Sequence, residues 1–231
     1  MPTFLASQKP LMVSLARWSA PADPAAFEAE CAKLQDKKDF AALATKLRTA
    51  MLAKLASANE ADGRNAFAIL LQLLVQWKVL AAQAEPLADE LVTFGSKGEA
   101  AGTACTLLLA LYPVVQEHAA TSQVSLLMTL ISFCAKNASL GRVLGPVEQR
   151  IERVERWVAE WTIKEEQQRE LWALIFDTHT EEAAVLYEAA IKYFALHEKA
   201  DLKASPKELR DRIVMALMMT IRSPDLVRTP S

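Results

Sequence analysis

The chain has 231 residues, of which 52% are hydrophobic and only 6 are glycine, so it can bury a substantial core and is not expected to be disordered. Its 26 basic and 28 acidic residues nearly cancel, which leaves no basic excess of the kind that binds nucleic-acid phosphates. Direct, sequence-specific nucleic-acid binding is therefore not expected. The densest apolar stretch, Phe67 to Trp77, contains two glutamines and stops at Lys78, which favours a buried helix over a membrane span.

The first residues lack an acidic side chain before Asp23 and contain Lys9 and Arg17. This composition faintly resembles a mitochondrial transit peptide. Prolines within this segment and the absence of a long basic amphipathic stretch favour a simpler interpretation. We expect residues 1–21 to be a flexible leader to the first helix.

Helix signals recur from Asp23 onward, and hardly any window shows the alternation of a strand. Asp23 and Asp39 each have the chemistry of a helix N-cap. Further helices are predicted at about 65–82 after a break at Gly63, from Pro86 to Gly95, around Leu107–Leu111 and at Val124–Phe133. Glycines at 141 and 145 predict a sub-boundary near 138–146 within a helical-repeat domain that spans 22–222.

The second half predicts helices that start near 146, 163, 180 and 206. The segments Thr162-x-x-Glu165 and Ser205-Pro206-x-Glu208 have the capping-box spacing, and Thr180 is a third candidate start. Successive helices with short turns form antiparallel hairpins, and a row of hairpins forms a solenoid. No strict period is present, so we predict an all-α fold of degenerate, tetratricopeptide-like or HEAT-like repeats.

Three of the five tryptophans lie between Trp157 and Trp172. In the predicted helices, Trp161 falls on an apolar stripe with Ile151 and Val154, and Trp157 lies on its flank, where Arg153 could stack on it. We expect Trp157, Trp161 and Trp172 to be structural core between two helices. Stacking of a ligand is the alternative, and the glutamates nearby argue against a nucleic acid.

The last predicted helix, about 206–222, has apolar residues on two sides. We expect one side to pack inward, comprising Leu209, Ile213, Val214, Leu217 and Ile221. Met215, Met218 and Met219 lie on the opposite side and are our candidates for partner contact, because another chain or a further C-terminal module would have to cover them. Scattered surface methionines are the alternative.

The sequence contains no pattern that predicts catalysis. His118, His179 and His197 have no metal-ligand spacing, and we expect surface or helix-capping roles for them. Cys31, Cys105 and Cys134 are far apart and are expected to be small core residues in a reducing compartment. We therefore expect a protein that is not an enzyme, with no catalytic residues, no cofactor and no metal.

The stretch RVERWVAEWTIKEEQQRELWALIFD resembles the helical-repeat region of the family of subunit m of eukaryotic translation initiation factor 3, a PCI-domain family. In that pattern an aliphatic-x-basic-Trp-aliphatic-x-acidic-Trp run closes one helix before a Leu-rich second one. The matching positions are Val154, Arg156, Trp157, Val158, Glu160 and Trp161. The resemblance extends over roughly 87–225, through LADELVTF at its start to IVMALMMTIRSPD at its end.

The resemblance implies a non-catalytic, cytoplasmic scaffold that holds other subunits of initiation factor 3 and reaches the small (40S) ribosomal subunit through that complex. Neither a membrane nor direct sequence-specific nucleic acid is implied as a partner. The family continues into a PCI winged-helix part, which we expect to be absent here, with residues 223–231 as a tail. The alternatives are a PCI scaffold of the COP9 signalosome or proteasome lid and an unrelated helical-repeat adaptor that binds peptides.

Overall fold

The computed structural model describes residues 3–20, 23–96, 100–137, 139–161, 163–179, 182–197 and 206–223. The described residues form an all-α structure in which no strand occurs. The chain divides into two compact units, Met1–Phe133 and Cys134–Ser231. This division falls within a helix, a few residues before the sub-boundary predicted at 138–146.

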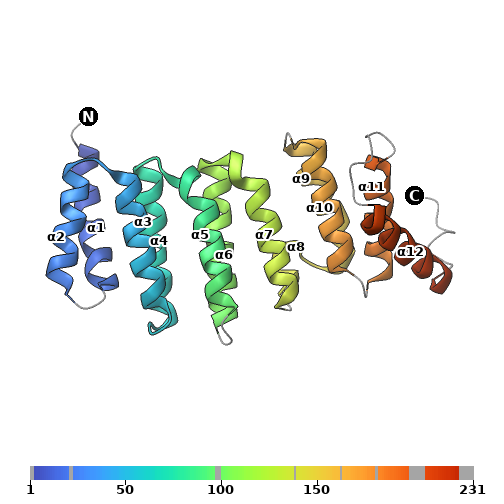
Figure 1. Cartoon of the computed structure of the whole chain (residues 1–231), viewed down its shortest axis with the longest axis horizontal. Helices are drawn as coiled ribbons and strands as arrows, with labels where there is room; N and C mark the ends of the chain where they lie inside the picture. The colour runs from blue at the N-terminus through green and yellow to red at the C-terminus, as the bar shows by residue number, and fades with distance from the viewer. Residues whose placement is uncertain are drawn as a thin grey trace. The chain divides into compact units, whose positions relative to one another are not determined.

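The first unit is a set of helices, of which the first six each pack on the next in chain order. Its described helices are α1 (Thr3–Ser19), α2 (Pro24–Asp36), α3 (Phe40–Leu55), α4 (Glu60–Gln76), α5 (Leu80–Gly95), α6 (Ala101–His118), η2 (Ala120–Ser122) and α7 (Gln123–Lys136). In this unit α3 and α4 lie side by side, as do α5 and α6 (Figure 1). Apolar residues three and four positions apart fill the core between these helices, as amphipathic helices require.

The predicted leader is instead a helix that belongs to the first unit. Met12, Leu15 and Ala16 are at most 1% exposed, and α1 packs against α2, α3 and α4. Trp77 Nε1 also donates a hydrogen bond to Gln8 Oε1 over 3.1 Å. The expectation of a flexible leader is wrong because the apolar spacing after Pro10 matches a helix face, and burial of that face outweighs the helix-breaking effect of an exposed proline.

Two of the helix starts follow the sequence signals closely. Asp23 accepts a hydrogen bond from the Ala26 amide at 3.0 Å, and Asp39 accepts one from Ala42 at 3.1 Å. These two N-caps are confirmed.

The break predicted at Gly63 is wrong, because α4 already begins at Glu60, after an Asn59 cap. Gly63 is buried within α4, where a Cβ would come within 2.8 Å of Leu55 Cδ2. Its role is therefore to permit the close approach of α3 and α4.

The single helix predicted at 65–82 is in fact split by a turn after Gln76. Lys78 adopts a left-handed backbone conformation with φ of 59°, and the Val79 amide donates to the Leu74 carbonyl over 3.0 Å. The turn after α2 repeats this arrangement at Lys38, with φ of 58°. Both are Schellman turns, which sequence analysis missed because a lysine occupies the position where glycine is usual.

A buried charged group connects α3 and α5. Arg48 is 7% exposed and donates from Nη1 to Gln83 Oε1 at 2.6 Å. Its Nη2 donates to Glu90 Oε1 at 3.1 Å, and its Nε lies 2.9 Å from the other oxygen of that carboxylate. The pairing matters because a buried guanidinium without a carboxylate partner would strongly destabilise the core.

The second unit is built around α11. Its described helices are α8 (Gly141–Leu144), η3 (Val147–Gln149), α9 (Arg150–Glu160), α10 (Glu165–Thr178), α11 (Ala183–His197) and α12 (Pro206–Arg222). Helices α9, α10 and α12 each pack against α11. The side chain of Arg150 donates to the Gly145 carbonyl and that of Arg153 to the Val143 carbonyl, which holds the preceding turn against α9.

The helix starts in this unit agree with the sequence to within four residues. Helix α12 begins at Pro206 as predicted, but α9 begins at Arg150, α10 at Glu165 and α11 at Ala183. The Lys164 amide donates to Gln167 Oε1 over 3.3 Å, so Gln167 takes the place expected for Glu165 in a capping box. The hydroxyl residues Thr162, Thr180 and Ser205 lie outside the described residues.

Burial of α1 gives a direct test of its place in the first unit. Leu15→Ala should lower the free energy of unfolding by about 2 to 5 kcal/mol, because it leaves a cavity between α1 and its neighbours. Denaturant unfolding measures this change. Ser14→Ala, at an exposed position of the same helix, is the control and should change stability little. Equal stability of the Leu15 variant and the parent would show that α1 is not part of the core.

Candidate functional site

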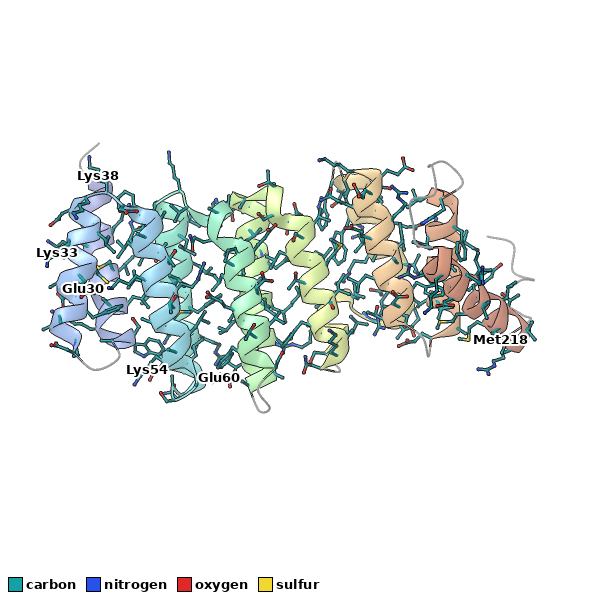
Figure 2. All side chains as sticks on the ribbon, viewed as in Figure 1. Glu30, Lys33, Lys38, Lys54, Glu60 and Met218 are labelled. Carbon is teal, nitrogen blue, oxygen red and sulfur yellow. The ribbon has the colours of Figure 1, made fainter. Side chains whose placement is uncertain are left out.

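Helix α12 exposes most of its apolar side chains. We define the α12 apolar face as Ile213, Val214, Leu217, Met218 and Ile221, which are 39%, 52%, 58%, 46% and 75% exposed. These residues recur at spacings of three and four, so they share one side of the helix. Figure 2 labels Met218, which projects from α12. Such a contiguous apolar surface is typical of a protein contact site.

The opposite side of α12 packs against α11. Arg212, Ala216, Met219 and Thr220 are partly buried there. The inward stripe expected from the sequence is thus wrong at Ile213, Val214, Leu217 and Ile221, which face outward. The small Ala216 lets the two helices approach, whereas the larger aliphatic residues on the other side would hold them apart. The side chain of Leu209 lies outside the described residues.

The three methionines singled out from the sequence do not share one environment. Met215 and Met218 are 41% and 46% exposed, whereas Met219 is partly buried on the side that faces α11. Met218 belongs to the α12 apolar face and Met215 lies beside it. Met219 therefore contributes to the packing of α12, so the structure does not bring the three together on one surface.

Arg212 fixes the orientation of α12 through two other helices. Its Nε and Nη2 donate to Oδ1 and Oδ2 of Asp177 on α10, at 3.0 and 2.6 Å. Its Nη1 donates to the Tyr193 hydroxyl on α11 at 3.1 Å. The hydrogen bond with Asp177 raises the pKa of Arg212 above its usual value. This bidentate pair holds one side of α12 inward, and the α12 apolar face consequently points outward.

The tryptophan cluster divides into a stacked pair and a buried ring. Trp157 and Trp161 stack with ring centroids 5.6 Å apart and an interplanar angle of 13°, and both are partly buried. Trp172 is 3% exposed in α10. The sequence predicted Trp161 to be a core residue, and this prediction is wrong. Helix α9 ends at Glu160, and Trp161 takes an extended backbone conformation at the C-cap. Arg153 donates to a backbone carbonyl, and the partner of the Trp157 ring is Trp161.

The histidines lie near helix ends. His118 is exposed in the last turn of α6, whereas His179 and His197 are buried at the ends of α10 and α11. Each of the two buried rings places Nδ1 near the carbonyl four residues earlier, at 2.7 Å from Ile175 and 3.1 Å from Tyr193. Sequence analysis expected surface or capping roles and did not anticipate the burial of His179 and His197.

Among the residues that the structure describes, the cysteines are buried and the acidic side chains form no metal-ligand cluster. Cys31, Cys105 and Cys134 are at most 1% exposed, and burial raises the pKa of the Cys31 thiol to about 11. In the described ranges no three His, Cys, Asp or Glu side chains are grouped as metal ligands would be. A thiol with a raised pKa is a poor nucleophile, which agrees with a structural role for Cys31.

The described helices contain none that is both long and apolar enough to cross a membrane. No family model, no curated protein and no solved structure matches this chain.

Arg212 is the important residue that sequence analysis missed. Its sequence neighbours are a mixture of charged and apolar residues, so no local pattern separates it from Arg210 or Arg222. The available signal is the small Ala216 one turn later, which marks the packed side of α12. Its partners, Asp177 and Tyr193, lie 35 and 19 residues away and could be paired with it only in three dimensions.

Removing the Arg212 side-chain charge tests its role in α12. Arg212→Met should lower the free energy of unfolding by about 1 to 2 kcal/mol, since Asp177 is half-exposed and solvent screens part of the ion pair. Chemical denaturation measures the loss. Arg222→Met, at an exposed position of the same helix, is the matched control. Equal effects of the two substitutions would contradict the assigned role of Arg212.

Buried His179 predicts a pH dependence of stability. Burial is the main cause that lowers the pKa of His179, and Arg150 lowers it further, against smaller opposing effects of the Ile175 carbonyl and Glu182. The unfolded chain therefore binds this proton more readily. The contribution of the buried, neutral His179 ring to the free energy of unfolding is therefore complete above about pH 6.5, the pKa of histidine in the unfolded chain. This contribution decreases as the pH falls below that value.

Denaturation at pH 7.5 and 5.5 measures this dependence. His179→Gln should reduce the difference in unfolding free energy between the two pH values. An identical pH dependence in the His179 variant and the parent would count against the assignment.

Proposed function

We propose that this protein is a non-catalytic, cytoplasmic scaffold subunit of a multi-subunit translation initiation complex, resembling subunit m of initiation factor 3. In this proposal it holds other PCI subunits and contributes to association with the small ribosomal subunit. The single observation that carries the proposal is the α12 apolar face, which Arg212 holds outward. A face of this kind suits a protein that works by holding partners.

The arrangement of the helices also supports the proposal. Consecutive helices from α1 to α6 pack on one another in the first unit, and α10, α11 and α12 do so in the second. This order is what a helical-repeat solenoid of the PCI type would require. The stacked Trp157 and Trp161 close α9 before the Leu-rich α10, which is the order of elements in the sequence resemblance.

The charges beside the α12 apolar face indicate what its partner carries. Lys207 and Arg210 are exposed, and the helical spacing places them on the same side as Val214 and Leu217. The exposed Asp211 lies at the edge of that side, so the basic charge is only partly offset. A complementary partner surface would therefore be apolar with carboxylates at one end. Such charge pairing selects a partner and aligns it, while the buried aliphatic side chains supply most of the affinity.

A co-purification experiment tests the proposed function. The tagged chain, expressed in eukaryotic cells, should recover initiation factor 3 subunits and small-subunit ribosomal proteins, identified by mass spectrometry. Leu217→Glu combined with Ile221→Glu should reduce that recovery about tenfold, because it places charges in the contact. The melting temperature should stay near that of the parent, since both side chains are more than half exposed.

Ile191→Glu is the matched control, because Ile191 is 49% exposed on α11 rather than on α12. Recovery should survive this substitution. Recovery of COP9 signalosome or proteasome lid subunits instead would assign the chain to another assembly. Undiminished recovery with the double α12 variant would show that the α12 apolar face does not contact these partners.

A further inference from the structure

The second unit contains a buried histidine at the end of the helix that holds Arg212. His179 directly follows the last turn of α10 and is 0% exposed. It comes two residues after Asp177, whose carboxylate accepts both hydrogen bonds that Arg212 donates to α10. A change at the His179 ring therefore acts next to the contact that orients α12.

The His179 ring completes the last turn of α10. The His179 amide points to the Phe176 carbonyl at 3.4 Å, so the Ile175 carbonyl receives no amide from the residue four positions later. Nδ1 of the ring lies 2.7 Å from the Ile175 carbonyl oxygen instead, and the Thr178 hydroxyl is a more distant donor at 3.2 Å. A carbonyl oxygen can only accept, so Nδ1 carries the proton and donates. The ring thus replaces a missing backbone hydrogen bond.

The other nitrogen of the His179 ring is without a partner. With the proton on Nδ1, Nε2 of the neutral ring is an acceptor, and no donor among the described residues reaches this buried atom. A second proton would convert Nε2 into a charged, buried donor that has no acceptor. Burial of an unpaired charge costs far more than burial of a neutral acceptor, so the closed site accommodates only the neutral ring.

The charged groups around the ring do not offset this cost. Arg150 at the start of α9 repels a protonated ring, and Glu182, just before α11, attracts it. These two side chains pair with each other at 3.4 Å, and Asp177 on the same helix as the ring is paired with Arg212. Burial is the main cause that lowers the pKa of His179. The ring therefore takes up a proton more readily once it is exposed.

Protonation consequently favours a state in which the last turn of α10 is open. Asp177 belongs to that turn, and its bidentate pair with Arg212 requires both carboxylate oxygens in place. The Tyr193 hydroxyl on α11 is the remaining partner of Arg212. We propose that His179 is a pH switch for α12: protonation of its ring opens the last turn of α10 and loosens the contact with Arg212, while α11 stays folded. As a control of partner binding, this switch rests on the proposed function of the α12 apolar face.

Proton linkage gives the expected size of the effect. A histidine that opening exposes has a pKa of about 6.5. Because the closed ring is neutral, proton uptake multiplies the equilibrium constant for opening by about 11 at pH 5.5 and by about 1.1 at pH 7.5. Opening of the last turn of α10 should therefore be about tenfold more frequent at the lower pH.

Thiol labelling of the full chain tests the switch. Ala216→Cys reports on the packed side of α12, and Leu217→Cys reports on its exposed side. The ratio of the two maleimide rates, 216 to 217, removes the pH dependence that both thiols share. Between pH 7.5 and 5.5 this ratio should rise at least about threefold, which is less than the effect on opening because Ala216 is partly exposed even when α12 is held.

Urea distinguishes opening of one turn from unfolding of the unit. Opening of the last turn of α10 exposes little surface, so the ratio at pH 5.5 should be nearly the same in water and in a low concentration of urea. A ratio that rises with urea as steeply as global unfolding would contradict a local switch.

Two variants, each combined with the two reporter cysteines, connect the effect to the named residues. His179→Gln does not titrate in this range, so the rise of the ratio between the two pH values should be lost. Arg212→Met lacks the contact that the switch controls and should give a high ratio at both pH values. Circular dichroism of each variant checks its folding.

Nuclear magnetic resonance tests the assignment of the ring proton. In the chain labelled with ¹⁵N-histidine, the ring signals that disappear in His179→Gln should show the tautomer with the proton on Nδ1 at pH 7.5.

The switch is overturned by a proton on Nε2, by a ratio that is equal at the two pH values in the parent, or by an undiminished rise in the His179 or Arg212 variant. These measurements use the isolated chain without a partner. Failure of the switch and failure of the proposed scaffold function can thus be told apart.

Discussion

The contact of Arg212 with Asp177 and Tyr193 decides which side of α12 faces outward. One guanidinium bonds to side chains from α10 and α11, so rotation of α12 about its axis would break a bidentate ion pair and a hydrogen bond together. With that side held inward, the aliphatic residues Ile213, Val214, Leu217 and Ile221 remain 39% to 75% exposed. The proposed scaffold function depends on this constraint.

A second arginine also connects helices through side-chain hydrogen bonds. Arg48 connects α3 and α5 as Arg212 connects α10 and α12, but Arg48 is 7% exposed and its network lies within the core of the first unit. The two arginines differ in their role. Arg48 stabilises the core of the first unit, whereas Arg212 determines that the α12 apolar face is exposed.

The sequence predicted the all-α fold because apolar periodicity and N-cap residues act over a few positions. Asp23 and Asp39 show this for helix starts. The Lys78 turn was missed since the left-handed conformation is rare for lysine, and the helix of Thr3–Ser19 was missed because Pro10 outweighed the apolar spacing that follows it. The orientation of α12 was reversed because its partners Asp177 and Tyr193 are remote in sequence. Helical periodicity identifies faces, but only contacts with other helices determine which face is buried.

Thiol accessibility along α12 tests the orientation of this helix most directly. Leu217→Cys and Ala216→Cys place single thiols on its opposite sides, and the natural cysteines are at most 1% exposed, so their background reaction should be slow. In the folded, isolated chain, the rate of reaction with a maleimide should be at least about tenfold higher for the cysteine at 217 than for that at 216. Equal rates, or faster reaction at 216, would contradict the outward placement of the α12 apolar face.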